Sequence, residues 1–148
     1  MPPDVLIRRI QPPDIPTVLQ IQADGPEASR WSAHDYDRAC DGSFHGVVAL
    51  RDGLLAGFLV ARVADADVEI LNLAVHSAVR RQGIATQLLS AALAHARFLA
   101  AKNCFLEVRH TNSAAISLYL RHGFIQVGCR PAYYSEPLAD ALLFKLSL

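Results

Sequence analysis

Residues 72–86 place an apolar run directly before a basic, glycine-containing turn and a long helical pattern. The first backbone N–H groups of a helix lack partners within the helix, and the helix dipole adds positive partial charge at the same end. Arg80 and Arg81 add further positive charge, and no Ser, Thr, Asp or Asn immediately precedes Ile84 to cap the helix. An uncapped, basic helix start opened by Gly83 predicts an anion site, in particular for a phosphate. The alternative is a pair of solvated arginines in an ordinary loop.

Length and composition restrict the class of protein. The chain has 148 residues, enough for one domain with a buried core, and we expect a single domain over residues 1–148. Its formal net charge of zero gives no general attraction to nucleic acid or to an anionic membrane. The start Met-Pro-Pro-Asp is unlike a signal peptide, and no apolar run has transmembrane length. We therefore expect a cytoplasmic protein with neither nucleic acid nor membrane as partner.

The cysteines and histidines lack the spacing of a disulfide framework or a metal site. Cys40, Cys104 and Cys129 are odd in number and far apart, which predicts reduced, buried thiols. The six histidines show no ligand pattern such as His-x-x-x-His beside an acid, so we predict no metal. They are His34, His45, His76, His95, His110 and His122.

Strand and helix patterns alternate along the chain without a repeat or a low-complexity linker. The predicted strands cover residues 5–10, 45–50, 54–63, 68–75, 104–108, 124–129 and 141–148. The predicted helices cover residues 15–22, 32–40, 84–101 and 112–122, with Asp14, Ser32 and Asn112 as caps. A loop rich in Pro and Tyr joins the last two strands. This order predicts an α/β layer fold with a mixed sheet.

The turn Arg80-Arg-Gln-Gly83-Ile-Ala85 resembles the phosphate-binding turn of the GNAT acyltransferases, written Gln/Arg-x-x-Gly-x-Gly/Ala. The predicted order of strands and helices also resembles this family along nearly the whole chain. The resemblance implies a single GNAT domain with a mixed, mostly antiparallel sheet of six or seven strands and four flanking helices. It also implies two parallel strands that splay apart at the site of the cosubstrate, acetyl-CoA.

A second motif, from Leu106 to Phe124, is similar to the bacterial subgroup that acetylates the N-terminal alanine of a ribosomal protein. The similarity to this subgroup covers residues 72–75, 80–89, 106–124, Trp31-Ser32 and Tyr133-Tyr134. Two features depart from it: His76 replaces the usual Asp, and residues 131–138 do not match closely. The resemblance thus implies an acetyl-CoA-dependent N-acetyltransferase with a protein or peptide acceptor.

The resemblance also implies roles for individual residues. Glu107 would be the general base and Tyr119 the general acid, while Trp31, Tyr133 and Tyr134 would line the peptide groove. Backbone groups of the splayed strand would hold the pantetheine arm, and the turn would wrap the pyrophosphate. The implied cofactor-binding residues are Leu73, Ala74, Val75, Arg80, Arg81, Gln82, Gly83, Ile84, Ala85, Thr86 and Asn112.

Acetyl transfer needs a neutral amine, a donor for the developing oxyanion and a proton for the leaving thiolate. A backbone N–H near Val75 is a candidate oxyanion donor, and Glu107 is a candidate base at the end of its strand. Tyr119, with an ordinary pKa of about 10, stays protonated at neutral pH. Asn112 and Tyr119 are seven residues apart and therefore share one helix face.

Each of these side chains also has a purely structural interpretation. Glu107 alternatively pairs with Arg109 or Arg130, and Tyr119 is alternatively a core residue. Trp31 is alternatively a packing residue, and the two neighbouring tyrosines are ordinary loop residues. His76 and His110 lie close enough to the expected site to assist as bases. Glu136 would meet a basic peptide.

Three functional hypotheses follow: a protein N-terminal acetyltransferase, a GNAT enzyme for a small amine or a lysine side chain, and a non-catalytic CoA-binding domain. An N-terminal amine has a pKa of about 7.7–8.0, whereas the lysine amine is near 10.4. Neutralising the lysine therefore costs roughly 3 kcal/mol more. A single carboxylate base favours the N-terminal amine.

Overall fold

A computed structural model describes residues 4–25, 28–135 and 138–148, which build one seven-stranded sheet of order β1-β2-β3-β4-β5-β7-β6. The strands are β1 (Val5–Arg9), β2 (His45–Arg51), β3 (Leu54–Ala64), β4 (Asp67–Val75), β5 (Asn103–Arg109), β6 (Ile125–Ser135) and β7 (Leu138–Ser147). Strands β4 and β5 are parallel, and the other neighbours are antiparallel. The predicted mixed, mostly antiparallel sheet is confirmed.

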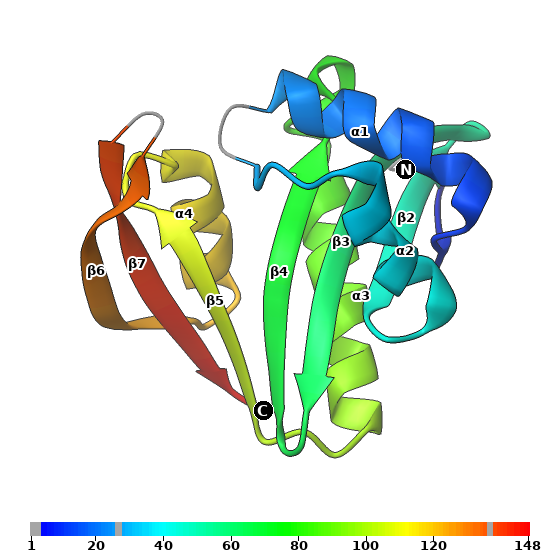
Figure 1. The fold of residues 1–148 in the computed structure, drawn as a ribbon. Coiled ribbons are helices and arrows are strands. Elements are labelled where there is room, and N and C mark those ends of the chain that lie inside the picture. Colours follow the sequence, from blue (N-terminus) through cyan, green and yellow to red (C-terminus); the bar gives the residue numbers. More distant parts are fainter. Residues whose placement is uncertain (1–3, 26–27, 136–137) are drawn as a thin grey trace.

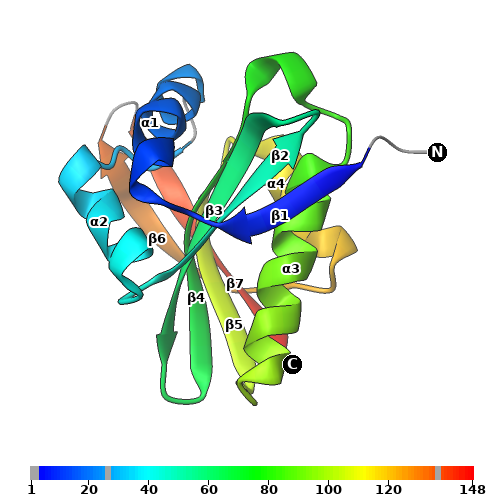
Figure 2. The same ribbon diagram turned by 90° about the vertical axis from the view of Figure 1, so that its right-hand side faces the viewer.

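Two pairs of helices cover the two faces of the sheet (Figures 1 and 2). One face carries α1 (Ile15–Asp24) and α2 (Ala33–Asp41), and the other carries α3 (Ile84–Phe98) and α4 (Ser113–Arg121). Within the described ranges, no helix combines the length and apolar character needed to cross a membrane.

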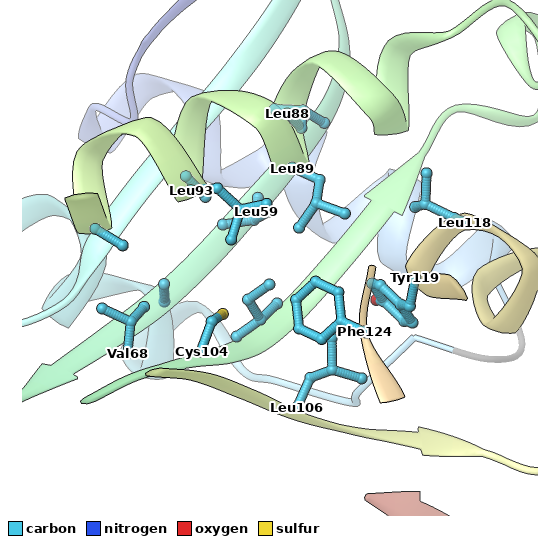
Figure 3. Packing of buried hydrophobic residues seen from close by; sticks show 14 of the residues in the cluster. Leu59, Val68, Leu88, Leu89, Leu93, Cys104, Leu106, Leu118, Tyr119 and Phe124 are labelled. Carbon is cyan, nitrogen blue, oxygen red and sulfur yellow. The ribbon is translucent and has the colours of Figure 1, made fainter. Parts of the chain in front are cut away.

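Alternation along the strands fills a separate core on each face. In β3, Leu59 packs with Leu88 of α3, whereas Phe58 packs with Tyr36 of α2. The core beneath α3 and α4 continues to Phe124, as Figure 3 shows. Both cores contact β3, so this strand fixes the two helical layers relative to each other.

Side-chain caps begin two of the four helices as the sequence predicts. The Ser32 hydroxyl accepts the Asp35 N–H at 3.2 Å, and the Asn112 carbonyl oxygen accepts the Ala115 N–H at 3.1 Å. The cap predicted from Asp14 is wrong. Its two carboxylate oxygens bind the Arg8 guanidinium at 2.8 and 2.9 Å. This ion pair, with a bond from the Gln11 N–H, turns the carboxylate away from α1.

The predicted loop between the last two strands is wrong, because β6 and β7 continue toward each other as strands. The ladder shifts register between Arg130 and Tyr134, where Ala132 adopts a positive φ of 51°. Pro131 lies at this irregularity, where its missing N–H breaks no ladder bond. The bulge thus accommodates Pro131, one of the residues from which a loop was predicted.

Two smaller expectations also differ from the structure. Helix α3 ends at Phe98 rather than at residue 101, and Ala100 takes a positive φ of 60° just after it. Cys104 is buried as expected, but Cys129 is exposed on the edge strand β6 and Cys40 is half-buried.

Strands β4 and β5 pair only at one end, from Asp67 opposite Asn103 to Ile70 opposite Leu106. Beyond this point they diverge, as Figure 1 shows, and the predicted splayed pair is confirmed. The β3–β4 ladder passes from Ile70 to Asn72 and leaves Leu71 without an opposing residue. This bulge bends β4 away from its parallel neighbour at the point where the pairing ends.

Gly46 of β2 tests the packing of the α2 layer. A Cβ at this position would lie 2.6 Å from Ile10 Cγ2 and 2.7 Å from Ala39 Cβ. We expect Gly46→Ala to lower the free energy of unfolding by about 1–3 kcal/mol, measured by urea denaturation. Gly128→Ala is the matched control, since its Cβ would meet Leu143 at 3.7 Å, and it should stay within about 0.5 kcal/mol of wild type. Equal losses in both variants would contradict this packing.

Candidate active site

A cleft of about 730 Å³ lies between the diverging ends of β4 and β5. This volume is typical of a small-molecule or cofactor site. It brings together most of the residues assigned to the site from the sequence. These are Leu73, Ala74, Val75, Arg80, Arg81, Gly83, Ile84, Ala85, Thr86, Glu107, Asn112, Tyr119 and Tyr134.

Three of the described residues assigned to the site from the sequence, Gln82, Trp31 and Tyr133, are not part of this lining. The Trp31 ring packs 5.2 Å from Tyr36 and 6.0 Å from Phe44, centroid to centroid, in the core beneath α1 and α2. The Tyr133 ring is half-exposed and meets Tyr134 edge-on. Glu136 lies outside the described residues.

The turn before α3 holds its backbone in an uncommon conformation. Arg81 and Gly83 have positive φ angles of 64° and 81°. The first backbone bond of the helix runs from the Gln87 N–H to the Gly83 carbonyl at 3.0 Å, so the N–H groups of residues 84–86 precede it. A left-handed conformation costs a non-glycine residue such as Arg81 roughly 1–2 kcal/mol. Residues 84–86 belong to the cleft lining, and free N–H groups at a helix start suit a phosphate.

Arg80 borders the same cleft, but its guanidinium turns back toward the protein. Its Nη2 donates to the Asp24 carbonyl at 3.3 Å and its Nε to the Val75 carbonyl at 3.4 Å. Arg80 therefore ties the turn to the end of α1, where a cation interacts favourably with the helix dipole. In this position the Arg80 side chain stabilises the conformation of the turn.

Glu107 approaches the cleft from the face that carries α1 and α2. Its strand neighbours Leu106 and Val108 are buried beneath α3 and α4, so the side chain between them points to the opposite face. Its Oε1 lies 3.2 Å from Nη2 of Arg130, and its side chain is 25% exposed. One of the two ion pairs considered from the sequence is therefore present. The Arg130 side chain is 56% exposed, and an ion pair so open to solvent contributes at most about 1 kcal/mol.

Tyr119 reaches the cleft from the other face, on α4. Its ring is 6% exposed and packs 5.6 Å from the Phe124 ring, centroid to centroid (Figure 3). Burial in this apolar surrounding raises the pKa of the phenol above its ordinary value. The hydroxyl therefore remains protonated across the physiological pH range and acts as a donor.

The backbone of Val75 directs its N–H toward the cleft. The next N–H along β4, that of His76, donates to the Ala56 carbonyl of β3 at 2.7 Å. Because successive N–H groups of a strand point to opposite edges, the Val75 N–H points away from β3. The edge of β4 that faces the cleft therefore carries a backbone donor at Val75.

Both histidines considered as assistants use one ring nitrogen in a local bond. His76 Nδ1 accepts the Ala78 N–H, and His110 Nδ1 accepts the Asp140 N–H, each at 3.0 Å. Only Nε2 of each ring remains for chemistry. In the part of the chain that the structure describes, no three His, Cys, Asp or Glu side chains gather as metal ligands would.

Several polar residues of the cleft were not assigned to the site from the sequence. Ser29 and Asn72 lie 43 residues apart and meet at the cleft, as the bond between Ser29 N–H and Asn72 Oδ1 at 3.2 Å shows. The others are Arg109, Ser117 and Arg121. Arg109 places its guanidinium 4.3 Å from the Tyr134 ring centroid. Their strand and helix positions alone give no sign of this convergence.

Comparisons with known proteins agree with this geometry. The chain is 31% identical to an uncharacterized protein of Mycobacterium leprae, over 95% of this chain but only 40% of that protein's length. It is 26% identical to the ribosomal protein bS18-alanine N-acetyltransferase of Escherichia coli strain K12, over 96% of this chain and 97% of that protein.

Among solved structures, the ribosomal-protein-S18-alanine N-acetyltransferase of Escherichia coli superposes with a TM-score of 0.86. It is 25% identical to this chain and covers 97% of it, with 94% of its own chain matched. The sequence model described as the acetyltransferase (GNAT) family matches residues 12–124. The chain therefore belongs to the GNAT family of acetyltransferases and is an acetyl-CoA-dependent N-acetyltransferase.

Proposed function

We propose that this enzyme transfers the acetyl group of acetyl-CoA directly to the N-terminal α-amine of a protein, such as a ribosomal protein. The observation that carries the proposal is the approach of Glu107 and Tyr119 to one cleft from opposite faces of the sheet. A base on one face and a proton donor on the other suit a transfer in which amine and thiol enter from different sides. Relatives that act on the alanine of a ribosomal protein support the same acceptor class.

The cleft fits acetyl-CoA as cosubstrate. The diverging backbone of Leu73–Val75 suits the pantetheine arm, because its outer edge carries polar groups that β5 no longer pairs. The N–H groups at the start of α3 suit the pyrophosphate. Asn112 caps α4 and borders the same cleft, so it would contact the cosubstrate from the other side.

Three groups of the cleft would each take one role in the transfer. Glu107 would take the proton of the attacking amine, directly or through a water, and the Val75 N–H would stabilise the oxyanion. The Tyr119 hydroxyl would donate to the departing thiolate sulfur. A buried phenol stays neutral until that negative charge develops, so its donation is stronger in the transition state than in the ground state.

The charge of the cleft favours an N-terminal amine over a lysine or a polyamine. Of the described residues that line it, Glu107 is the one carboxylate, beside Arg80, Arg81, Arg109 and Arg121. A site for a strongly cationic amine would be rich in acids to offset several charges. One carboxylate suits an amine that is already partly neutral at pH 7.

A panel of acceptors tests this proposal by mass spectrometry of the products. It contains peptides with a free N-terminus, several of them beginning with Ala, N-blocked peptides with an internal lysine, and small polyamines. We expect an acetyl mass gain only on free N-termini. Gain on lysine or polyamine would instead assign a small-amine or side-chain acceptor. Binding of acetyl-CoA without any transfer would favour a non-catalytic CoA-binding domain.

Removal of either catalytic group tests the mechanism. Glu107→Gln and Tyr119→Phe should each lower kcat by about 10²–10⁴ while acetyl-CoA affinity by calorimetry stays near wild type. Glu69→Gln is the matched carboxylate control, because Glu69 pairs with Arg62 at 2.6 Å outside the cleft lining.

Arg130→Gln separates the two roles of Glu107. If Glu107 serves only its ion pair, Arg130→Gln and Glu107→Gln will have the same effect on turnover, and the assignment of the base is wrong.

Gly83→Val tests the anion site. A side chain there is strained at a φ of 81° and would extend into the open space where the phosphates approach. We expect acetyl-CoA affinity to fall at least about tenfold by calorimetry. Gly53→Val, at a φ of 77° in the β2–β3 turn, carries the same backbone strain outside the cleft lining. It should lose stability but keep its affinity, and an equal loss of affinity in both would remove the turn from cofactor binding.

A further inference from the structure

Asn72 of β4 has its whole amide group engaged. Its Oδ1 accepts the N–H groups of Ser29 at 3.2 Å and of Leu73 at 3.1 Å. Its Nδ2 donates to the Ser29 carbonyl at 3.3 Å and to the Tyr36 hydroxyl at 3.1 Å. A primary amide has two donors and two acceptor positions, so every one is used. With Ser29 alone, Asn72 makes the two backbone bonds that a neighbouring strand would make.

Tyr36 and Gln22 extend this arrangement away from the cleft. Tyr36 is fully buried and donates its single hydroxyl proton to Gln22 Oε1, so it can only accept from Asn72. Gln22, also buried, donates its Nε2 to the Trp31 carbonyl at 2.8 Å. The chain of donors therefore runs in one direction, from Asn72 through Tyr36 to Gln22. It fixes the segment between α1 and α2 at Ser29 and at Trp31.

Ser29 of this segment borders the cleft on the face from which Glu107 approaches. Ser29 and Asn72 both belong to the cleft lining. In Figure 2, α1 and α2 lie on one side of the sheet, and α3 and α4 on the other. The start of α3 and Tyr119, assigned above to the cosubstrate, belong to that other side. Ser29 therefore forms part of the wall toward the acceptor amine.

We infer that Asn72 is a positioning residue for the acceptor. It holds Ser29 in place as part of the acceptor-side wall of the cleft, and it contributes to acceptor binding without taking part in the chemistry. This inference rests on the proposed function for the nature of the acceptor. The bulge at Leu71 makes the arrangement possible, because it turns Asn72 toward α2 rather than toward α3.

Steady-state kinetics of Asn72→Ala test this inference with a peptide that begins with Ala as the acceptor. We expect the KM for the peptide to rise about 10- to 100-fold, with the KM for acetyl-CoA within about twofold of wild type. Tyr36→Phe keeps the ring beside Trp31 and Phe58 but breaks the donor chain, so it should shift the peptide KM in the same direction by a smaller factor.

Asn103→Ala is the matched control. Asn103 also lies in the parallel pair, at its closed end, where its Nδ2 donates to Asp67 Oδ1 at 3.1 Å. It should leave both KM values unchanged. An equal rise of both KM values in Asn72→Ala, or an unchanged peptide KM, would overturn the inference.

Amide hydrogen exchange provides a second readout that does not depend on the acceptor. The Ser29 N–H should be protected in wild type and in Asn103→Ala, and should exchange rapidly in Asn72→Ala. Rapid exchange in wild type would overturn the inference, whatever amine is acetylated.

The same experiments distinguish failure of the proposed function from failure of the positioning role of Asn72. If wild type acetylates only lysine or polyamine, the proposed acceptor is wrong, but the same KM split on that amine still supports the positioning role. If wild type acetylates none of the amines, both the proposed function and the acceptor role of Asn72 are refuted.

Discussion

The early end of the pairing between β4 and β5 is the constraint on which the site depends. Pairing stops after Ile70 and Leu106, and a bulge at Leu71 bends β4 away from its neighbour. A parallel pair that remained closed would use its backbone groups within the sheet and leave no space for a ligand. The opening instead exposes the backbone edge of β4 and admits groups from both helical layers. The sheet stays continuous because β4 pairs with β3 on both sides of the bulge.

The two side chains proposed for catalysis lie on opposite faces of the opening. Alternation on β5 directs Glu107 to one side, while Tyr119 of α4 arrives from the other. The carboxylate is partly open to solvent and the phenol is almost fully buried. These environments suit a base that must exchange its proton with water and a donor that must hold its proton until a thiolate forms. The fold thus keeps the Tyr119 hydroxyl and the Glu107 carboxylate apart within a single cleft.

Local sequence patterns predicted most of the fold, and most of the residues that the resemblance assigned to the site line the cleft. The helix starts at Ser32 and Asn112 and the turn at Gly83 are local signals, and the structure has them in place. Asp14 failed as a cap because a residue outside its helix, Arg8, competes for the carboxylate. The meeting of segments far apart in sequence, such as residues 28–31 with β4, depends on tertiary packing. A short stretch of sequence does not predict such a contact.

The amide network at Asn72 also restricts which sequences can preserve this wall. An Asp of the same length lacks two donors, a Gln moves the amide outward by one methylene, and a Ser reaches fewer partners. Each hydrogen bond from Asn72 through Tyr36 to Gln22 has a fixed donor and a fixed acceptor. A substitution at Gln22 or Tyr36 therefore reverses or breaks a neighbouring hydrogen bond. The three side chains therefore act as one hydrogen-bonded unit. A substitution at one of these positions keeps the cleft wall at Ser29 ordered only when the other two positions change to match it.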